Sequence, residues 1–227
     1  EGGVWLATNG GLGYMAPDGG LRWWEQGAGG PLGTVITVAS DGAGGVWAST
    51  GRRESPLVHF DGTRWTGYGP EEGLTMPEVH RIRRTPAYGT WVLGLSVAYP
   101  RATEAHEGER PVYRIVDGEV EAWGREHGLG AGRVYGVAES PDGTLWFATV
   151  RGLMRYRQGT WTVWDTRDGL RLDRVFDVAV DRQGTVWFTD QNYGLVSIDE
   201  EDDLRRVTVE DGLVLVAQLD VAVKRIG

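Results

Sequence analysis

The chain has 227 residues, a formal net charge of −9, 36 Gly, 11 Trp and no Cys. The negative charge argues against non-specific nucleic-acid binding, and the absence of Cys excludes disulfides, Cys-ligated zinc and a thiol nucleophile. Abundant Gly disfavours helix interiors, whereas Trp suits half-buried sheet surfaces, so the composition favours an all-β fold.

A repeated motif runs along the chain and contains one tryptophan in each copy. The copies begin at Gly2, Gly44, Tyr88, Gly143 and Gly184 and read GGVWLAT, GGVWAST, YGTWVLG, GTLWFAT and GTVWFTD. Their tryptophans, Trp5, Trp47, Trp91, Trp146 and Trp187, are 42, 44, 55 and 41 residues apart. This period is typical of β-propeller blades, and the long gap indicates an insertion at about 95–111 in the third blade.

Each repeat is predicted to supply four antiparallel strands. An apolar strand and a tight turn precede the tryptophan, as in RVYGVAESPDGTLW from Arg133, and a second hairpin follows, as in GLMRYRQGTWTVW from Gly152. Gly-Leu pairs, such as Gly128-Leu129 and Gly169-Leu170, then mark the loop to the next blade.

The ends of the chain fit a closed ring of five blades that forms a single domain over residues 1–227. Thirteen residues run from the start of each inner strand to the residue before its tryptophan, as from Arg133 and Arg174. Residues 219–227 followed by 1–4 give the same length, so we expect 219–227 to complete the first blade. Closure would remove an exposed sheet edge. The alternative is a longer array cut at a blade boundary.

The run DGLRLDRVFDVAVDRQGTVWFTDQNYGL from Asp168 resembles the two-component-regulator propeller repeat. That resemblance implies a sensor portion of a bacterial signalling receptor, periplasmic or extracellular, which binds a small molecule such as a carbohydrate fragment. The repeat is also similar to that of streptogramin lyases, although their general-base His and metal-binding carboxylate match no motif here. No transmembrane segment is expected, because the most apolar run, from Gly212, is interrupted by Gln218 and Asp220.

The predicted binding surface is the face around the central channel, where the loops between second and third strands meet. These loops differ from blade to blade, which suits either a binding surface or simple tolerance of change. Arginine forks grip carboxylates or phosphates, and tyrosine rings stack on sugars. The candidate ligand-binding residues are Arg52, Arg53, Tyr99, Arg101, Arg151, Asp190, Gln191, Asn192 and Tyr193. Surface arginines can also serve only solvation and weak ion pairs.

Two charged residues, Arg81 and Asp177, occupy equivalent inner-strand positions and are predicted to line the channel. They would either pair with each other across it or line a water-filled passage that binds ligand.

No catalytic constellation, metal site or cofactor site is expected. None of the four histidines has metal-ligand spacing with another, and neither a GxSxG elbow nor a GxxxxGK loop occurs. The leading hypothesis is therefore a non-catalytic propeller that binds a small polar or anionic ligand. A lyase or glycoside-active enzyme is the first alternative, and a protein-interaction scaffold that uses the third-blade insertion is the second.

Overall fold

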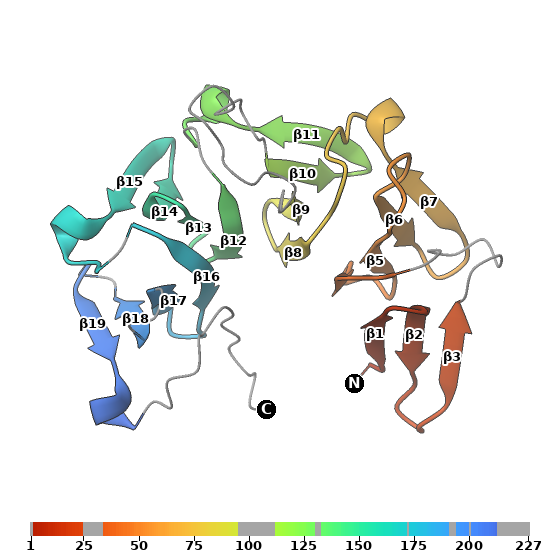
Figure 1. Cartoon of the computed structure of the whole chain (residues 1–227), viewed down its shortest axis with the longest axis horizontal. Coiled ribbons are helices and arrows are strands. Elements are labelled where there is room, and N and C mark those ends of the chain that lie inside the picture. The colour runs from red at the N-terminus through yellow and green to blue at the C-terminus, as the bar shows by residue number, and fades with distance from the viewer. Residues whose placement is uncertain are drawn as a thin grey trace. The chain divides into compact units, whose positions relative to one another are not determined.

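The computed structural model of the chain describes residues 2–24, 34–94, 112–129, 133–171, 173–190, 194–199 and 201–212. Within these ranges the chain forms five consecutive antiparallel sheets, each built from strands that follow one another along the sequence (Figure 1). The prediction of an all-β fold with five repeated sheets is confirmed. The chain separates into two compact units, Glu1–His106 with Pro111–Gly124, and Glu107–Arg110 with Arg125–Gly227.

The first unit contains three sheets. The first sheet has three strands and the other two have four each. The strands are β1 (Val4–Thr8), β2 (Gly11–Met15) and β3 (Leu21–Trp24); β4 (Val38–Ser40), β5 (Val46–Ser49), β6 (Leu57–Phe60) and β7 (Trp65–Tyr68); and β8 (Arg81–Thr85), β9 (Gly89–Leu93), β10 (Val112–Val116) and β11 (Glu119–Trp123). The predicted fourth strand of the first sheet, 219–227, lies outside the described residues.

The second unit contains the fourth and fifth sheets, and its innermost strands, β12 and β16, lie side by side (Figure 1). The strands are β12 (Val134–Glu139), β13 (Leu145–Thr149), β14 (Gly152–Arg157) and β15 (Thr160–Trp164), then β16 (Val175–Val180), β17 (Val186–Asp190), β18 (Gly194–Ile198) and β19 (Leu204–Val207).

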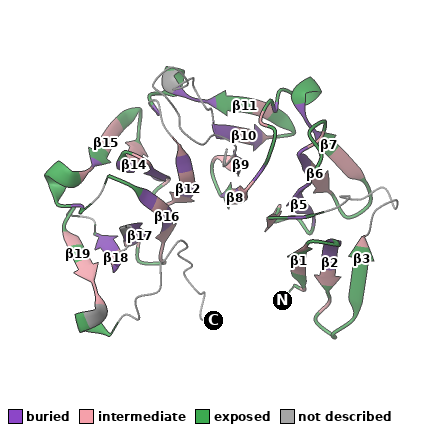
Figure 2. Cartoon of the chain, in the orientation of Figure 1, coloured by how far each residue is buried: buried purple, intermediate pink, exposed green. Residues whose placement is uncertain are grey.

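The second strand of each four-stranded sheet is packed on both faces, and its sequence is correspondingly apolar along its length. All five residues of β13, LWFAT, are buried, as are all four of β5, VWAS. The last strands carry more exposed residues, as β11 and β15 show (Figure 2). In the second unit, the core combines Phe188 and Val178 of the fifth sheet with Trp146 and Leu153 of the fourth.

A short 3-10 helix follows the last strand of each four-stranded sheet and leads to the Gly-Leu pair. These helices are Pro70–Glu72, Arg125–His127, Thr166–Asp168 and Val209–Asp211. At Gly169 the backbone is left-handed with φ +105°, a conformation that glycine adopts without a steric cost, and Leu170 then enters the core at 4% exposure. The Gly-Leu pair is therefore the point at which the chain turns into the next sheet.

Each four-stranded sheet has two ends with different connections. We call the end with the first-to-second and third-to-fourth strand turns the turn end. The other end, with the second-to-third strand loop and the exit to the next sheet, is the loop end. The predicted binding residues that the structure describes, Arg52, Arg53, Arg151 and Asp190, belong to the loop end.

Candidate functional site

The repeated tryptophan is anchored by the residue six positions before it, which ends the first strand or begins the turn to the second. In three sheets the indole Nε1 donates a hydrogen bond to that residue's side chain. The bonds run from Trp91 to Thr85 (3.0 Å), from Trp146 to Ser140 (2.9 Å) and from Trp187 to Asp181 (2.9 Å). In these three sheets the bond ties the first-to-second strand turn to the second strand.

The second sheet replaces this anchor with a histidine. His59 stacks on Trp47 with ring centroids 4.2 Å apart, and its Nε2 lies 2.9 Å from Oδ2 of Asp41. Burial acts to raise the pKa of Asp41, but hydrogen bonds from the Ala43 and Gly45 amides and from His59 outweigh it and hold that pKa below its usual value. The Asp41 carboxylate is thus ionised near neutral pH and orients the imidazole.

At the loop end, a threonine hydroxyl organises the loop between second and third strands. Thr50 Oγ1 donates to the Ser55 carbonyl (2.6 Å) and accepts the Arg52 amide (3.1 Å). Thr149 Oγ1 likewise donates to the Gly152 carbonyl (2.9 Å) and accepts the Arg151 amide (3.0 Å). Arg52 and Arg151 therefore occupy equivalent positions on two Thr-capped loops.

Three of the predicted ligand-binding arginines project from these loops. Arg52, Arg53 and Arg151 are exposed, and within the described residues their guanidinium groups have no hydrogen bond or ion pair. Arg52 and Arg53 belong to the first unit and Arg151 to the second. Asp190 is the last residue of β17, where its backbone pairs with Val175 and Gly194. The remaining predicted residues, Tyr99, Arg101, Gln191, Asn192 and Tyr193, lie outside the described residues.

Asp177, predicted to line the channel, is completely buried in the second unit. Its amide donates to Thr189 Oγ1 (3.2 Å), and the adjacent Phe176 amide donates to the same oxygen (3.2 Å). A Cβ placed on Gly136 of β12 would lie 2.6 Å from Oδ1 of Asp177. Asp177 thus fills the space beside a glycine of the neighbouring inner strand. Arg81 begins β8 in the first unit.

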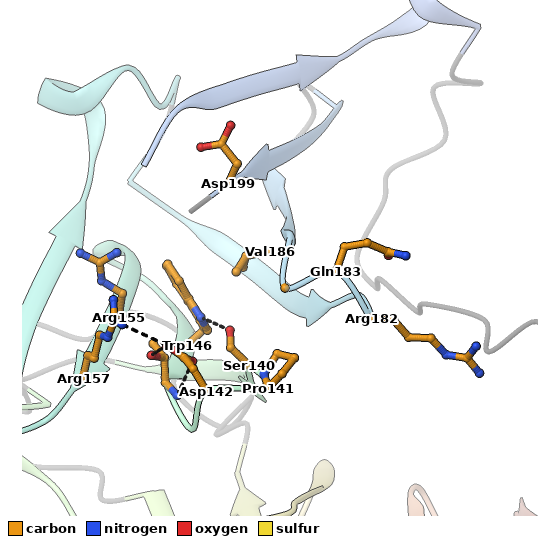
Figure 3. Close-up of a pocket in the computed structure, with 12 residues that line it drawn as sticks. Ser140, Pro141, Asp142, Trp146, Arg155, Arg157, Arg182, Gln183, Val186 and Asp199 are labelled. Atoms are coloured by element: carbon orange, nitrogen blue, oxygen red, sulfur yellow. Dashed lines mark hydrogen bonds and ion pairs between the residues drawn. The ribbon is translucent and has the colours of Figure 1, made fainter. Parts of the chain in front are cut away.

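A pocket of about 510 Å3 opens at the turn end of the fourth and fifth sheets, within the second unit (Figure 3). Its lining includes Ser140, Asp142 and Trp146 from the fourth sheet, and Arg182 and Asp199 from the fifth. None of the residues proposed from the sequence lines it. The sequence signal at these positions is the turn itself, in which Ser, Asp and Gly ordinarily serve backbone hydrogen bonds.

One arginine of the pocket, Arg155, is held by two indole rings and one carboxylate. The guanidinium of Arg155 lies 5.5 Å from the Trp146 ring centroid and 4.8 Å from that of Trp164. It also forms two hydrogen bonds with Asp202 of the fifth sheet, of 2.5 and 3.1 Å. This cation–π and bidentate arrangement binds the two sheets together.

The described residues contain no group of three or more His, Cys, Asp or Glu side chains that could hold a metal ion. Among them, no helix has the length and apolar character needed to cross a membrane.

Residues 128–151 match the model of the two component regulator propeller repeat. No curated protein matches the sequence significantly. The described chain is similar to an extracellular domain from B. thetaiotaomicron that is assigned to a hybrid two component system, with TM-score 0.65 and 15% identity over 92% of this chain and 27% of that one.

Two other solved structures share this likeness. PorZ, a surface component of the type-IX secretion system of Porphyromonas gingivalis, has TM-score 0.66 and 17% identity over 92% of this chain and 33% of its own. Virginiamycin B lyase from Staphylococcus aureus has TM-score 0.63 and 15% identity over 91% of this chain and 66% of its own. The chain spans 27% and 33% of the first two proteins. The chain therefore has the β-propeller fold and carries, at residues 128–151, a two component regulator propeller repeat.

Proposed function

We propose that this chain is a non-catalytic binding propeller that forms part of the extracytoplasmic sensing region of a bacterial signalling protein. The observation that carries the proposal is the two component regulator propeller repeat at residues 128–151, set in a fold shared with extracellular domains of two component systems. In this role, ligand binding changes the signalling output, and no covalent step is required of the propeller.

In each unit, the loop end of the sheets is the proposed binding surface. Arg52 and Arg151 are presented by loops whose backbones are fixed by Thr50 and Thr149, so the loop conformation does not have to be ordered when ligand binds. Their guanidinium groups have no partner within the described residues, which leaves their donors free for a carboxylate or phosphate. The ligand class that this surface supports is a small polar or anionic molecule, including acidic sugars.

The second candidate is a lyase-type enzyme, which the structural likeness to virginiamycin B lyase favours. Both candidates bind a small molecule, but only an enzyme changes it. The third candidate is a protein-interaction scaffold that uses residues 95–111. If this candidate is right, no small-molecule ligand will bind.

Thermal unfolding of the protein against uronic acids, acidic oligosaccharides, nucleotides and small anions tests the proposal, since a ligand that binds only the native state raises Tm. We expect one ligand class to raise Tm and the Arg151→Ala variant to lose that rise. Arg64→Ala is the matched control, because Arg64 is an exposed arginine in the turn between β6 and β7, at the turn end. A Tm shift that survives Arg151→Ala, or no shift with any compound, would contradict the proposal.

A further inference from the structure

The pocket at the turn end of the fourth and fifth sheets is separate from the proposed surface at the loop end. Each antiparallel sheet carries these two ends at opposite termini of its strands, and both sheets belong to one unit. The pocket volume of about 510 Å3 lies within the range of small-molecule sites.

Part of the lining is rigid and already satisfied. Trp146 is 5% exposed and anchored to Ser140, so its ring offers no open face for a sugar or aromatic ligand. Arg155 has its guanidinium over the Trp146 and Trp164 rings and uses two of its nitrogens to bind Asp202. These residues shape the pocket, and the ligand must be recognised by the remaining polar side chains.

The remaining charges are of both signs. Arg157 lies on the same strand as Arg155, and its guanidinium is 3.4 Å from Asp142, an interaction too long and exposed to satisfy its donors (Figure 3). Asp142 accepts hydrogen bonds from the amide and hydroxyl of Thr144, both at 3.0 Å. Burial acts to raise the pKa of Asp142, but these bonds and the charge of Arg157 outweigh it, so the pKa stays below its usual value.

The fifth sheet contributes a carboxylate and an amide. Asp199 Oδ1 accepts the amides of Glu201 (3.1 Å) and Asp203 (2.9 Å), while no bond to its second oxygen is present within the described residues. The Gln183 side chain is exposed and likewise has no hydrogen-bond partner there. Figure 3 shows Asp199 and Gln183 on the fifth sheet and Arg157 on the fourth, so opposite charges come from the two sheets.

We propose that this pocket binds a small zwitterion of the size of an amino acid or short peptide, with its carboxylate at Arg157 and its ammonium group at Asp199. A ligand with only negative charge would be repelled by the carboxylates of Asp142 and Asp199. A ligand with only positive charge would be repelled by Arg157 and Arg182. A ligand with both charges satisfies both sides. Neutral sugars find no exposed aromatic face here.

Calorimetric titration with the dipeptide L-alanyl-L-alanine tests the proposal. Two blocked analogues accompany it: the N-acetylated peptide, which lacks the ammonium group, and the C-amidated peptide, which lacks the carboxylate. We expect the free dipeptide to bind and each blocked form to lose about tenfold or more in affinity, as removal of a charge-assisted hydrogen bond does.

Variants assign the site. Arg157→Gln should weaken dipeptide binding by about tenfold or more, since it removes a charge-assisted bond. Arg64→Gln, in the turn end of the second sheet, should leave binding unchanged. For Asp199→Asn, both dipeptide affinity and Tm are measured, because Asp199 also accepts hydrogen bonds within its own turn. Arg151→Ala should leave dipeptide binding unchanged, so failure at the loop end and failure here give different results. Equal binding of the blocked peptides, or no binding of the free dipeptide, would overturn the proposal.

Discussion

Replacing Gly136 by alanine probes the closest approach between the inner strands of the second unit. An ideal Cβ at this position would lie 2.6 Å from Asp177 Oδ1 and 3.3 Å from both Asp177 Cα and Val178 N. Real Cβ atoms essentially never show the first distance, and Asp177 is fully buried, so its side chain has no solvent into which to swing. Overpacking of this kind costs about 1–3 kcal/mol.

Urea unfolding of the protein and of Gly136→Ala measures this cost. We expect a lower midpoint with an unchanged m-value and a loss of about 1–3 kcal/mol in the free energy of unfolding. Gly51→Ala is the matched control, because its Cβ would meet nothing within 4 Å. In an Asp177→Ala background the shortest contact is absent, so the cost of Gly136→Ala should fall by about 1 kcal/mol or more. An equal cost in both backgrounds would show that the contact with Asp177 is not the source of the destabilisation.

Three further predictions concern the frame of the sheets. Ser140→Ala removes the acceptor of the buried Trp146 Nε1 and should lower the free energy of unfolding by about 1–3 kcal/mol in urea titrations; no change would show that the anchor is dispensable. Phe188→Ala deletes a fully buried ring and should lower the free energy of unfolding by about 3–5 kcal/mol in the same measurement. A loss as small as that of a surface substitution would place this ring outside the core. The pKa of Asp41 is lower folded than the 3.8 of the unfolded chain, so its stabilisation is present above pH 3.8 and lost as pH falls through its folded pKa. Asp41→Asn should therefore weaken the acid dependence of unfolding, and an unaltered acid dependence would contradict the lowered pKa of Asp41.

The architecture could be predicted from the sequence because each repeat contains short sequence motifs that mark its strands and turns. A tryptophan on the second strand, a turn with Gly before it and a Gly-Leu pair after the last strand recur at nearly constant spacing, and the structure places them accordingly. Packing between neighbouring sheets also involves tryptophan: the ring centroid of Trp24 lies 5.8 Å from that of Phe60 in the next sheet. Such signals depend on nearest neighbours along the chain.

The pocket could not be predicted in this way. Ser140, Asp142 and Asp199 each have a local explanation as turn residues, and nothing in their spacing indicates that they line one pocket with Arg157 of a separate strand. The binding of Arg155 by Asp202, 47 residues away, is likewise a tertiary contact that the repeat pattern does not contain. The ligand-binding role of the loop-end residues is inferred from their variation between repeats, and it stays a prediction.

The most direct test of the proposed function combines calorimetric titration with mass spectrometry of the recovered ligand, using the acidic sugar or anion that gives the largest thermal shift. We expect saturable binding that Arg151→Ala abolishes, with the ligand recovered at unchanged mass after prolonged incubation. Recovery of a product of altered mass, formed by the wild-type protein and not by Arg151→Ala, would contradict a non-catalytic role and establish the propeller as an enzyme.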